Sequence, residues 1–328
     1  MDSLIFAINA VLPIILVTAF GYMLKKAKLM TEDFSKRANK LVFRAFLPIM
    51  LFLNVYKIKS IGDVKLGFVF FSLAAIAVIY AIAVPAVMLF VKDGAKRGTL
   101  IQSVFRSNYA IIGIPLAESL FGSDGAAVAS VLSAILIPVF NILAVITLSV
   151  FCKSEKKVTL GSIMLGILKN PLIEGVALGL VALGIRAVFV RYSVSFRLSD
   201  VTFLYSALSS IGSLATPLAL LVLGAQFEFS ALKGSARELT FGLVARCIVV
   251  PLSTLTVAYF VFKNAFGGAQ FAALVAAFGT PVAVSTVPMA QEMGADSKLA
   301  GQLVIASTLG SCLTVFIAST VLKAVGIF

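Results

Sequence analysis

Two apolar stretches of the sequence combine hydrogen-bonding side chains with residues that interrupt helices. The first stretch holds Asn108, Tyr109, Gly113 and Pro115, and the second holds Pro281, Ser285, Thr286 and Pro288. Proline removes a backbone donor and clashes with the preceding turn, and glycine loosens a helix further. A helix that restarts after such a break exposes backbone amides and a positive dipole end, which attract anions. The two stretches therefore predict a pair of broken helices that cross and bind an anion.

The elements that carry these stretches must lie in a membrane. The chain has 328 residues, of which 60% are apolar and only 12% charged, with a mean hydropathy of +1.09. A soluble domain carries about 25% charged residues. The composition predicts an all-α polytopic membrane protein and excludes a soluble enzyme and a β-barrel, which needs alternating strands. The net charge of +13 arises from Lys and Arg in short loops, so we expect no nucleic-acid partner.

Ten apolar runs are long enough to cross a bilayer, which takes about 20 residues. They cover 4–24, 38–57, 66–91, 99–121, 125–151, 170–190, 201–227, 237–262, 264–291 and 299–322. Lys and Arg favour the loops that follow the odd-numbered spans, which predicts that both termini lie outside the cytoplasm. Asp2 precedes the first run and basic residues follow it, the reverse of a signal peptide, so we expect this run to remain as a span.

The sequence offers little for a metal, a cofactor or catalysis. It has no histidine, and Cys152, Cys247 and Cys312 are far apart. A zinc site or a histidine-based relay would therefore lack ligands. We expect no metal, no cofactor and no enzymatic activity.

The second half of the sequence echoes the first. Ile114–Glu118 matches Val287–Gln291 at an offset of 173 residues. In the second span of each half, Pro48 is followed by Asn54 and Pro217 by Gln226. Matches in the same order predict two repeats of five spans, 1–168 and 169–328, and an odd span number inverts one repeat relative to the other. Secondary transporters with this architecture bind substrate at the repeat interface.

Three of the arginines within predicted spans allow two interpretations. Arg106, next to the first break, either draws anions toward it or extends to the membrane surface; Arg44 and Arg246 pose the same choice. No aspartate lies in mid-span, which argues against cation/proton exchange. Gly175 and Gly179 form a small-xxx-small motif that permits close helix packing.

These motifs resemble the auxin efflux carrier family over almost the whole chain. The resemblance rests on Arg106-Ser107-Asn108-Tyr109 running into Gly113-Ile114-Pro115-Leu116, and on Pro281 to Pro288 followed by Ala290-Gln291-Glu292. It implies a ten-span inverted repeat similar to sodium/proton antiporters and bile-acid symporters. Spans 1, 2, 6 and 7 would form a dimerising scaffold, and spans 3–5 and 8–10 would move as an elevator. Asn108 and Pro281 would be its crossover asparagine and proline.

The chain also departs from the plant members of that family. Ser107 stands where plant carriers have proline, which predicts a softer first break, and the segment 152–169 is too short for their long cytoplasmic loop. The short loop fits a bacterial type of permease, and we expect the chain to lie in a prokaryotic inner membrane.

We therefore expect a carrier of a small organic anion, a mono- or dicarboxylate, held between the two breaks. Its binding residues would be the eight named at the outset together with Asn54 and Gln226. The expected partners are this anion, the lipid bilayer and a second copy of the chain. The alternatives are a sodium-coupled symporter of bile-acid type, with cation sites among Asn108, Gln291 and Glu292, and a non-transporting sensor or channel.

Overall fold

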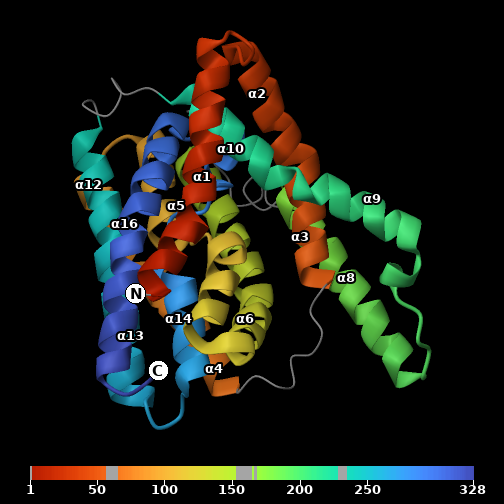
Figure 1. Ribbon diagram of the computed structural model, residues 1–328. Helices are drawn as coiled ribbons and strands as arrows, with labels where there is room; N and C mark the ends of the chain where they lie inside the picture. The colour runs from red at the N-terminus through yellow and green to blue at the C-terminus, as the bar shows by residue number, and fades with distance from the viewer. Residues whose placement is uncertain (1, 57–65, 153–164, 166–167, 228–234) are drawn as a thin grey trace.

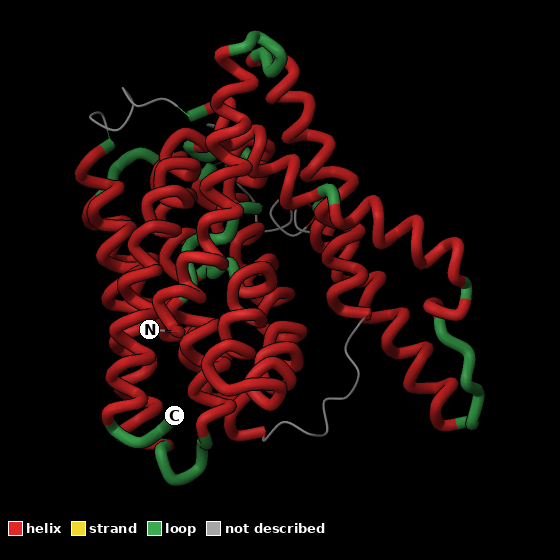
Figure 2. Tube along the Cα trace, in the orientation of Figure 1, coloured by secondary structure: helices red, strands yellow, loops and turns green. Residues whose placement is uncertain are grey.

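In the computed structural model, which describes residues 2–56, 66–152, 165, 168–227 and 235–328, the chain folds into helices (Figure 2). The first half comprises α1 (Asp2–Lys26), α2 (Glu32–Leu41), η1 (Val42–Phe46), α3 (Leu47–Tyr56), α4 (Leu66–Phe90), α5 (Gly94–Phe105), η2 (Tyr109–Gly113) and α6 (Ile114–Phe151). The second half comprises α8 (Pro171–Arg191), η3 (Leu198–Asp200), α9 (Thr202–Ser213), α10 (Ala215–Gln226), α12 (Ala236–Val244), η4 (Ala245–Val249), α13 (Val250–Phe262), α14 (Gly268–Gly279), α15 (Thr286–Glu292) and α16 (Ser297–Ala324).

Side-chain caps fix where several helices begin. Asp93 accepts a hydrogen bond from the backbone N–H of Ala95 at 2.8 Å, and Asn170 accepts one from Leu172 at 3.0 Å. Asp296 caps α16 in the same way through Leu299, at 2.9 Å. These caps satisfy backbone donors that the first turn of a helix leaves unpaired.

Seven helical segments in the described part of the chain are long and apolar enough to cross a membrane. They are Glu32–Tyr56, Leu66–Phe90, Ile111–Phe151, Pro171–Arg191, Thr202–Gln226, Ala236–Phe262 and Ser297–Ala324, and α14 is a shorter apolar helix. The 170–190 run, which has only a short uncharged core, forms the continuous helix α8. The protein is therefore a multi-pass membrane protein.

The segment Ile111–Phe151 contains a break in the helix. Phe121 (φ −145°, ψ 30°) and Gly122 (φ 61°, ψ −155°) are non-helical, and the positive φ at Gly122 is a conformation that glycine adopts without a steric penalty. The expected boundary between the runs 99–121 and 125–151 lies at this break.

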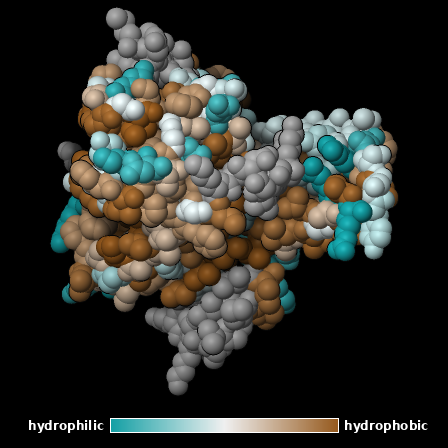
Figure 3. Space-filling view, turned by 90° about the horizontal axis from the view of Figure 1, so that it is seen from below, coloured by the Kyte–Doolittle hydropathy of each residue, from teal (hydrophilic) through white to brown (hydrophobic). Residues whose placement is uncertain are grey.

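The helices form a main bundle and an arm (Figure 1). The bundle contains α4, α5, α6, α12, α13, α14, α15 and α16, and α3, α8 and α9 extend away from it. Helix α3 packs on α8, and α1 packs on α10. The space-filling view shows hydrophobic residues over much of the visible face, including where the arm leaves the bundle (Figure 3).

Small residues allow the closest of these helix contacts. A Cβ added to Gly175 would meet the backbone of Pro48, and one added to Gly179 would meet Val55, so the predicted small-xxx-small motif packs α8 against α3. Gly224 of α10 lies equally close to the Thr18 carbonyl of α1. Backbones approach this closely only where side chains are absent.

Candidate functional site

Both predicted helix breaks are present. Helix α5 ends at Phe105, Arg106 is extended (φ −90°, ψ 112°), and η2 begins at Tyr109. Helix α14 ends at Gly279, Thr280 is extended (φ −78°, ψ 159°), and α15 begins only at Thr286.

The two breaks are joined by backbone hydrogen bonds. Ser107 and Val282 form an isolated antiparallel bridge. The N–H of Asn108 donates to the carbonyl of Pro281 at 2.8 Å, and the N–H of Ala283 donates to the carbonyl of Arg106 at 3.4 Å. Non-helical backbone at membrane depth needs such partners, because lipid offers none. The broken helices therefore cross at a defined point, which we call the crossover.

Arg246 holds the carboxyl ends of α5 and α14 together. It is 1% exposed, and its guanidinium donates to the carbonyl of Thr280 at 2.7 and 3.0 Å. The same guanidinium reaches the carbonyls of Val104 at 3.2 Å and Ala277 at 3.3 Å. Carbonyls at a helix carboxyl end lack intrahelical partners and carry partial negative charge. Arg246 supplies hydrogen-bond donors and a positive charge to the carboxyl ends of both α5 and α14.

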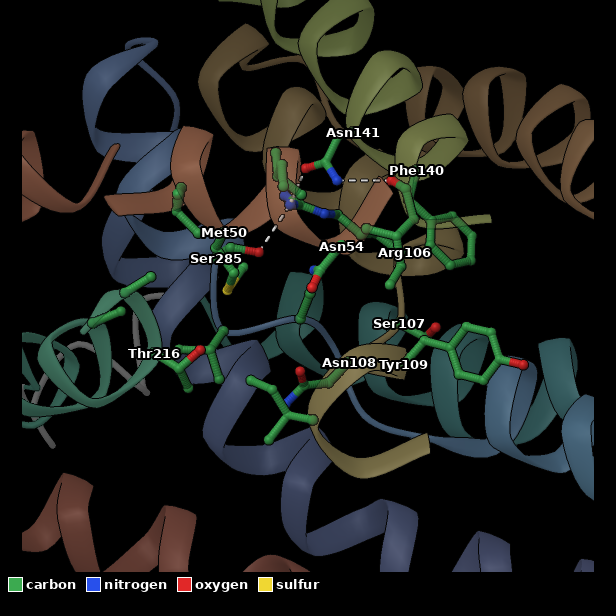
Figure 4. A pocket seen from close by; sticks show the side chains of 18 residues that line it. Met50, Asn54, Arg106, Ser107, Asn108, Tyr109, Phe140, Asn141, Thr216 and Ser285 are labelled. Carbon is green, nitrogen blue, oxygen red and sulfur yellow. Dashed lines mark hydrogen bonds between the residues drawn. The ribbon is translucent and has the colours of Figure 1, made fainter. Parts of the chain in front are cut away.

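Arg106 places a second guanidinium at the crossover. The residue is 3% exposed. Its Nη2 atom donates to Asn141 Oδ1 at 2.7 Å and to Ser285 Oγ at 2.8 Å, and its Nη1 atom contacts Met289 Sδ at 2.6 Å. Figure 4 shows Asn141 and Ser285 on the guanidinium side of Arg106. All of these partners are neutral.

No carboxylate balances the charge of Arg106 within the described part of the chain. The ion pairs found there join Lys36 to Glu32, Arg37 to Asp33, Arg44 to Glu292 and Lys96 to Glu238. Burying a charge without a counter-ion costs several kcal/mol, because the ion loses its hydration and gains no attraction in return. An anion from solution can supply the missing charge.

Arg106 lines a small cavity together with Asn54, Ser107, Asn108 and Ser285 (Figure 4). The cavity has a volume of about 50 Å³, which is room for a few water molecules. Ser107 Oγ and Asn108 Nδ2 are buried and have no hydrogen-bond partner in the described structure. The remaining wall is largely apolar and comes from α3, α6 and α10, including Leu47, Met50, Ile137, Phe140 and Ala219. From the described residues this cavity, the crossover cavity, offers one cation and several neutral polar groups.

Comparison with known proteins assigns the chain to a family. A family model described as "Membrane transport protein" matches residues 6–319. The chain belongs to that family, the auxin efflux carriers. An uncharacterized transporter of Methanocaldococcus jannaschii is 25% identical over 317 residues, covering 94% of this chain and 96% of the relative. An uncharacterized transporter of Methanothermobacter thermautotrophicus is 23% identical over 329 residues, covering 96% and 98%. This protein is therefore a membrane transporter.

Four of the predicted binding residues line the crossover cavity of this auxin efflux carrier: Asn54, Asn108, Tyr109 and Ser285. The Tyr109 hydroxyl points away from Arg106, toward the Ala273 carbonyl at 3.5 Å (Figure 4). Thr286 is fully buried at the start of α15, and its Oγ1 has no partner among the described residues.

The other predicted residues shape the backbone or lie elsewhere. Pro281 accepts the Asn108 hydrogen bond, and Pro115 and Pro288 lie in the first turns of α6 and α15. A Cβ on Gly113 would collide with the Tyr109 ring. Gln226 lines a different cavity of this carrier, where Asn39 Nδ2 donates to its Oε1 at 3.4 Å.

The three arginines of the predicted spans differ in where their side chains lie. The interpretation that Arg106 and Arg246 extend to the membrane surface is wrong, because both are buried and bonded at the crossover. Arg44 differs from both, because its side chain is 65% exposed and lies 3.8 Å from Glu292. Serine at position 107 does not abolish the first break.

Two partners of Arg106 escaped the sequence reasoning. Asn141 lies within the apolar run 125–151 and was a signal in itself, since an amide is rarely left in such a run without a partner. Met289 gave no signal, because methionine is common in membrane helices. The described residues contain no cluster of three His, Cys, Asp or Glu side chains that could hold a metal.

Proposed function

We propose that this auxin-efflux-carrier family member is a secondary transporter of a small organic anion, a mono- or dicarboxylate. The observation that carries the proposal is the buried guanidinium of Arg106, which faces the crossover cavity with neutral partners only. A bound carboxylate would accept hydrogen bonds from Arg106 and from the unpartnered Asn108 Nδ2. Charge-assisted bonds of this kind are about twice as strong as neutral ones.

The proposed architecture is a ten-span inverted repeat. In this arrangement α5 with η2 and the start of α6 forms span 4, and α14 with α15 forms span 9. The packing of α1 on α10 and of α8 on α3 supports it, because in each pair the first span of one half meets the second span of the other. The amino and carboxyl termini would lie outside the cytoplasm of a prokaryotic inner membrane.

Alternating access would come from movement of spans 3–5 and 8–10 past the scaffold of spans 1, 2, 6 and 7, as in other transporters with inverted repeats. Polar contacts between α15, which belongs to the moving part, and the scaffold would have to break during this motion. Gln291 Oε1 accepts from Asn39 Nδ2 at 2.5 Å and from Gln226 Nε2 at 3.2 Å, and Glu292 pairs with Arg44. Dimerisation through the arm would provide a fixed frame, and exposed apolar side chains on α8 and α9 suit such a contact, including Leu178, Val181, Ile185 and Phe203.

Transport in proteoliposomes tests the proposal. Malate, malonate, succinate, lactate and indole-3-acetate are offered in turn, with and without sodium or a pH step. We expect saturable uptake of at least one of them. A sodium requirement would identify the symporter alternative, and a conductance far above carrier turnover would identify a channel. Absence of flux for every compound, combined with ligand-induced thermal stabilisation, would favour a sensor and contradict the proposal.

A further inference from the structure

A second and larger cavity lies where the α1–α2 hairpin meets the main bundle. Its volume is about 600 Å³, and its walls come from the end of α1, from α2, α10, α15 and the start of α16. Four lysines line it, Lys25, Lys28, Lys36 and Lys298. We call it the lysine cavity.

The lysine cavity carries an excess of positive charge. Among the described lining residues Glu32 is the one acidic residue, and its carboxylate lies 2.7 Å from Lys36. The nearby Asp33 pairs with Arg37 at 2.9 Å. The described lining residues therefore have a formal charge of +3. A cleft lined by charges of one sign concentrates oppositely charged solutes and speeds their association by about 10- to 1,000-fold.

Neutral amides form the inner wall of this cavity. Gln302 is 3% exposed, and its Oε1 has no hydrogen-bond partner within the described part of the chain. Because the oxygen and nitrogen of an amide exchange places by a flip, the same side chain can donate to a carboxylate. Gln291 and Gln226 of the same wall are hydrogen-bonded to each other and to Asn39 of α2.

Helix α15 connects the lysine cavity with the crossover cavity. Ser285, directly before α15, lines the crossover cavity, and Gln291, near its end, lines the lysine cavity. At 1.5 Å per residue, a helix of this length spans roughly 10 Å. An anion in the lysine cavity would therefore be one short helix away from Arg106.

We propose that the lysine cavity is a second anion-binding site, the vestibule through which a carboxylate passes between the crossover and the lysine-rich side of the membrane. This inference rests on the proposed transport of an organic anion. The lysines attract the carboxylate, and Gln302 binds it before the amide wall of Asn39, Gln226 and Gln291 opens. The positive-inside rule makes this the cytoplasmic side.

Sided vesicles test the vestibule. The test variant is the triple change Lys25→Gln, Lys28→Gln and Lys298→Gln. The control removes three charges from the other side: Arg191→Gln, Lys263→Gln and Lys323→Gln. The probes are malate, malonate, succinate, lactate and indole-3-acetate, each offered separately. Inside-out vesicles expose the lysine cavity, and right-side-out vesicles expose the opposite face.

We expect the test variant to raise KM by about tenfold in inside-out vesicles and to flatten its dependence on ionic strength. Its KM in right-side-out vesicles and both KM values of the control should equal those of the wild type. Equal KM values in all vesicles, or a matching rise in the control, would overturn the inference. If the wild type transports none of the compounds in either type of vesicle, the proposed function itself is refuted.

A lipid phosphate presents similar chemistry, and a separate arm distinguishes it. Wild type and test variant are reconstituted in phosphatidylcholine alone and with added phosphatidylglycerol. Similar thermal stability in both membranes supports the vestibule. If phosphatidylglycerol stabilises only the wild type while KM stays unchanged, the cavity holds a lipid headgroup and the inference is overturned.

Discussion

The backbone N–H of Asn108 donates to the carbonyl of Pro281 at 2.8 Å, which ties the first helix break to the second. The two residues are far apart in sequence and come from opposite halves of the chain. Because each break supplies the partner that the other needs, neither can be replaced by regular helix without leaving polar backbone unpaired in the membrane. The crossover is thus a single unit built from both halves.

Asn108→Ala and Pro281→Ala should both impair transport, for different reasons. The first removes a side-chain donor from the crossover cavity, and the second permits α14 to extend through its break. We expect kcat/KM to fall by roughly tenfold or more in each, measured as initial uptake into proteoliposomes. Unchanged uptake in both variants would mean that the crossover is not the binding site.

Arg246→Gln should destabilise the protein. A shorter neutral side chain cannot reach carbonyls of both α5 and α14, and each buried acceptor left unpaired costs about 1–3 kcal/mol. Arg246→Lys should restore part of the loss, because it keeps the charge but donates in fewer directions. Thermal unfolding in detergent measures the effect. A melting temperature for Arg246→Gln equal to that of the wild type would refute the clamping role.

Gly175→Val should separate α8 from α3. The added side chain would overlap the backbone of Pro48, and overpacking of this kind costs about 1–3 kcal/mol. Gly184→Val on the same helix is the matched control, since nothing lies close to a Cβ at that position. Thermal unfolding should show a drop for the first variant alone. Equal drops would show that valine is harmful anywhere on α8.

Monocarboxylates should compete better than dicarboxylates of similar length. Arg106 is the one cationic residue among the described residues that line the crossover cavity, so a second carboxylate there would be buried without a counter-charge from them. We expect lactate or butyrate to inhibit uptake at concentrations roughly tenfold below those of malonate or succinate. The reverse order would show that neutral donors, such as Asn54 and Asn108, hold a second carboxylate.

The helix breaks could be read from the sequence because their cause is covalent. Pro115, Pro281 and Pro288 restrict the backbone and remove donors wherever the chain goes, and Gly113 makes a helix easier to interrupt. The family could also be recognised, since its motifs surround the same breaks. The presence of membrane helices could also be predicted, because the thickness of the bilayer sets the length of apolar run that a spanning helix needs.

The partners of the two buried arginines could not be read in this way. Arg106 meets Asn141 and Ser285, and Arg246 meets carbonyls of α5 and α14, through contacts between segments distant in sequence. Membrane helices are apolar on most faces, so their sequence does not reveal which face is turned toward a cavity. For the same reason Gln226 could not be assigned to the lysine cavity rather than to the crossover.

The most direct test of the central claim is equilibrium binding of the transported carboxylate to purified Arg106 variants. Arg106→Gln removes the buried charge, Arg106→Lys keeps it, and Arg191→Gln, at an exposed position far along the arm, is the matched control. Size-exclusion profiles verify that each variant is folded. We predict that Arg106→Gln weakens binding by roughly 10- to 100-fold, that Arg106→Lys weakens it less, and that Arg191→Gln binds like the wild type. Binding to a folded Arg106→Gln protein with unchanged affinity would contradict the account.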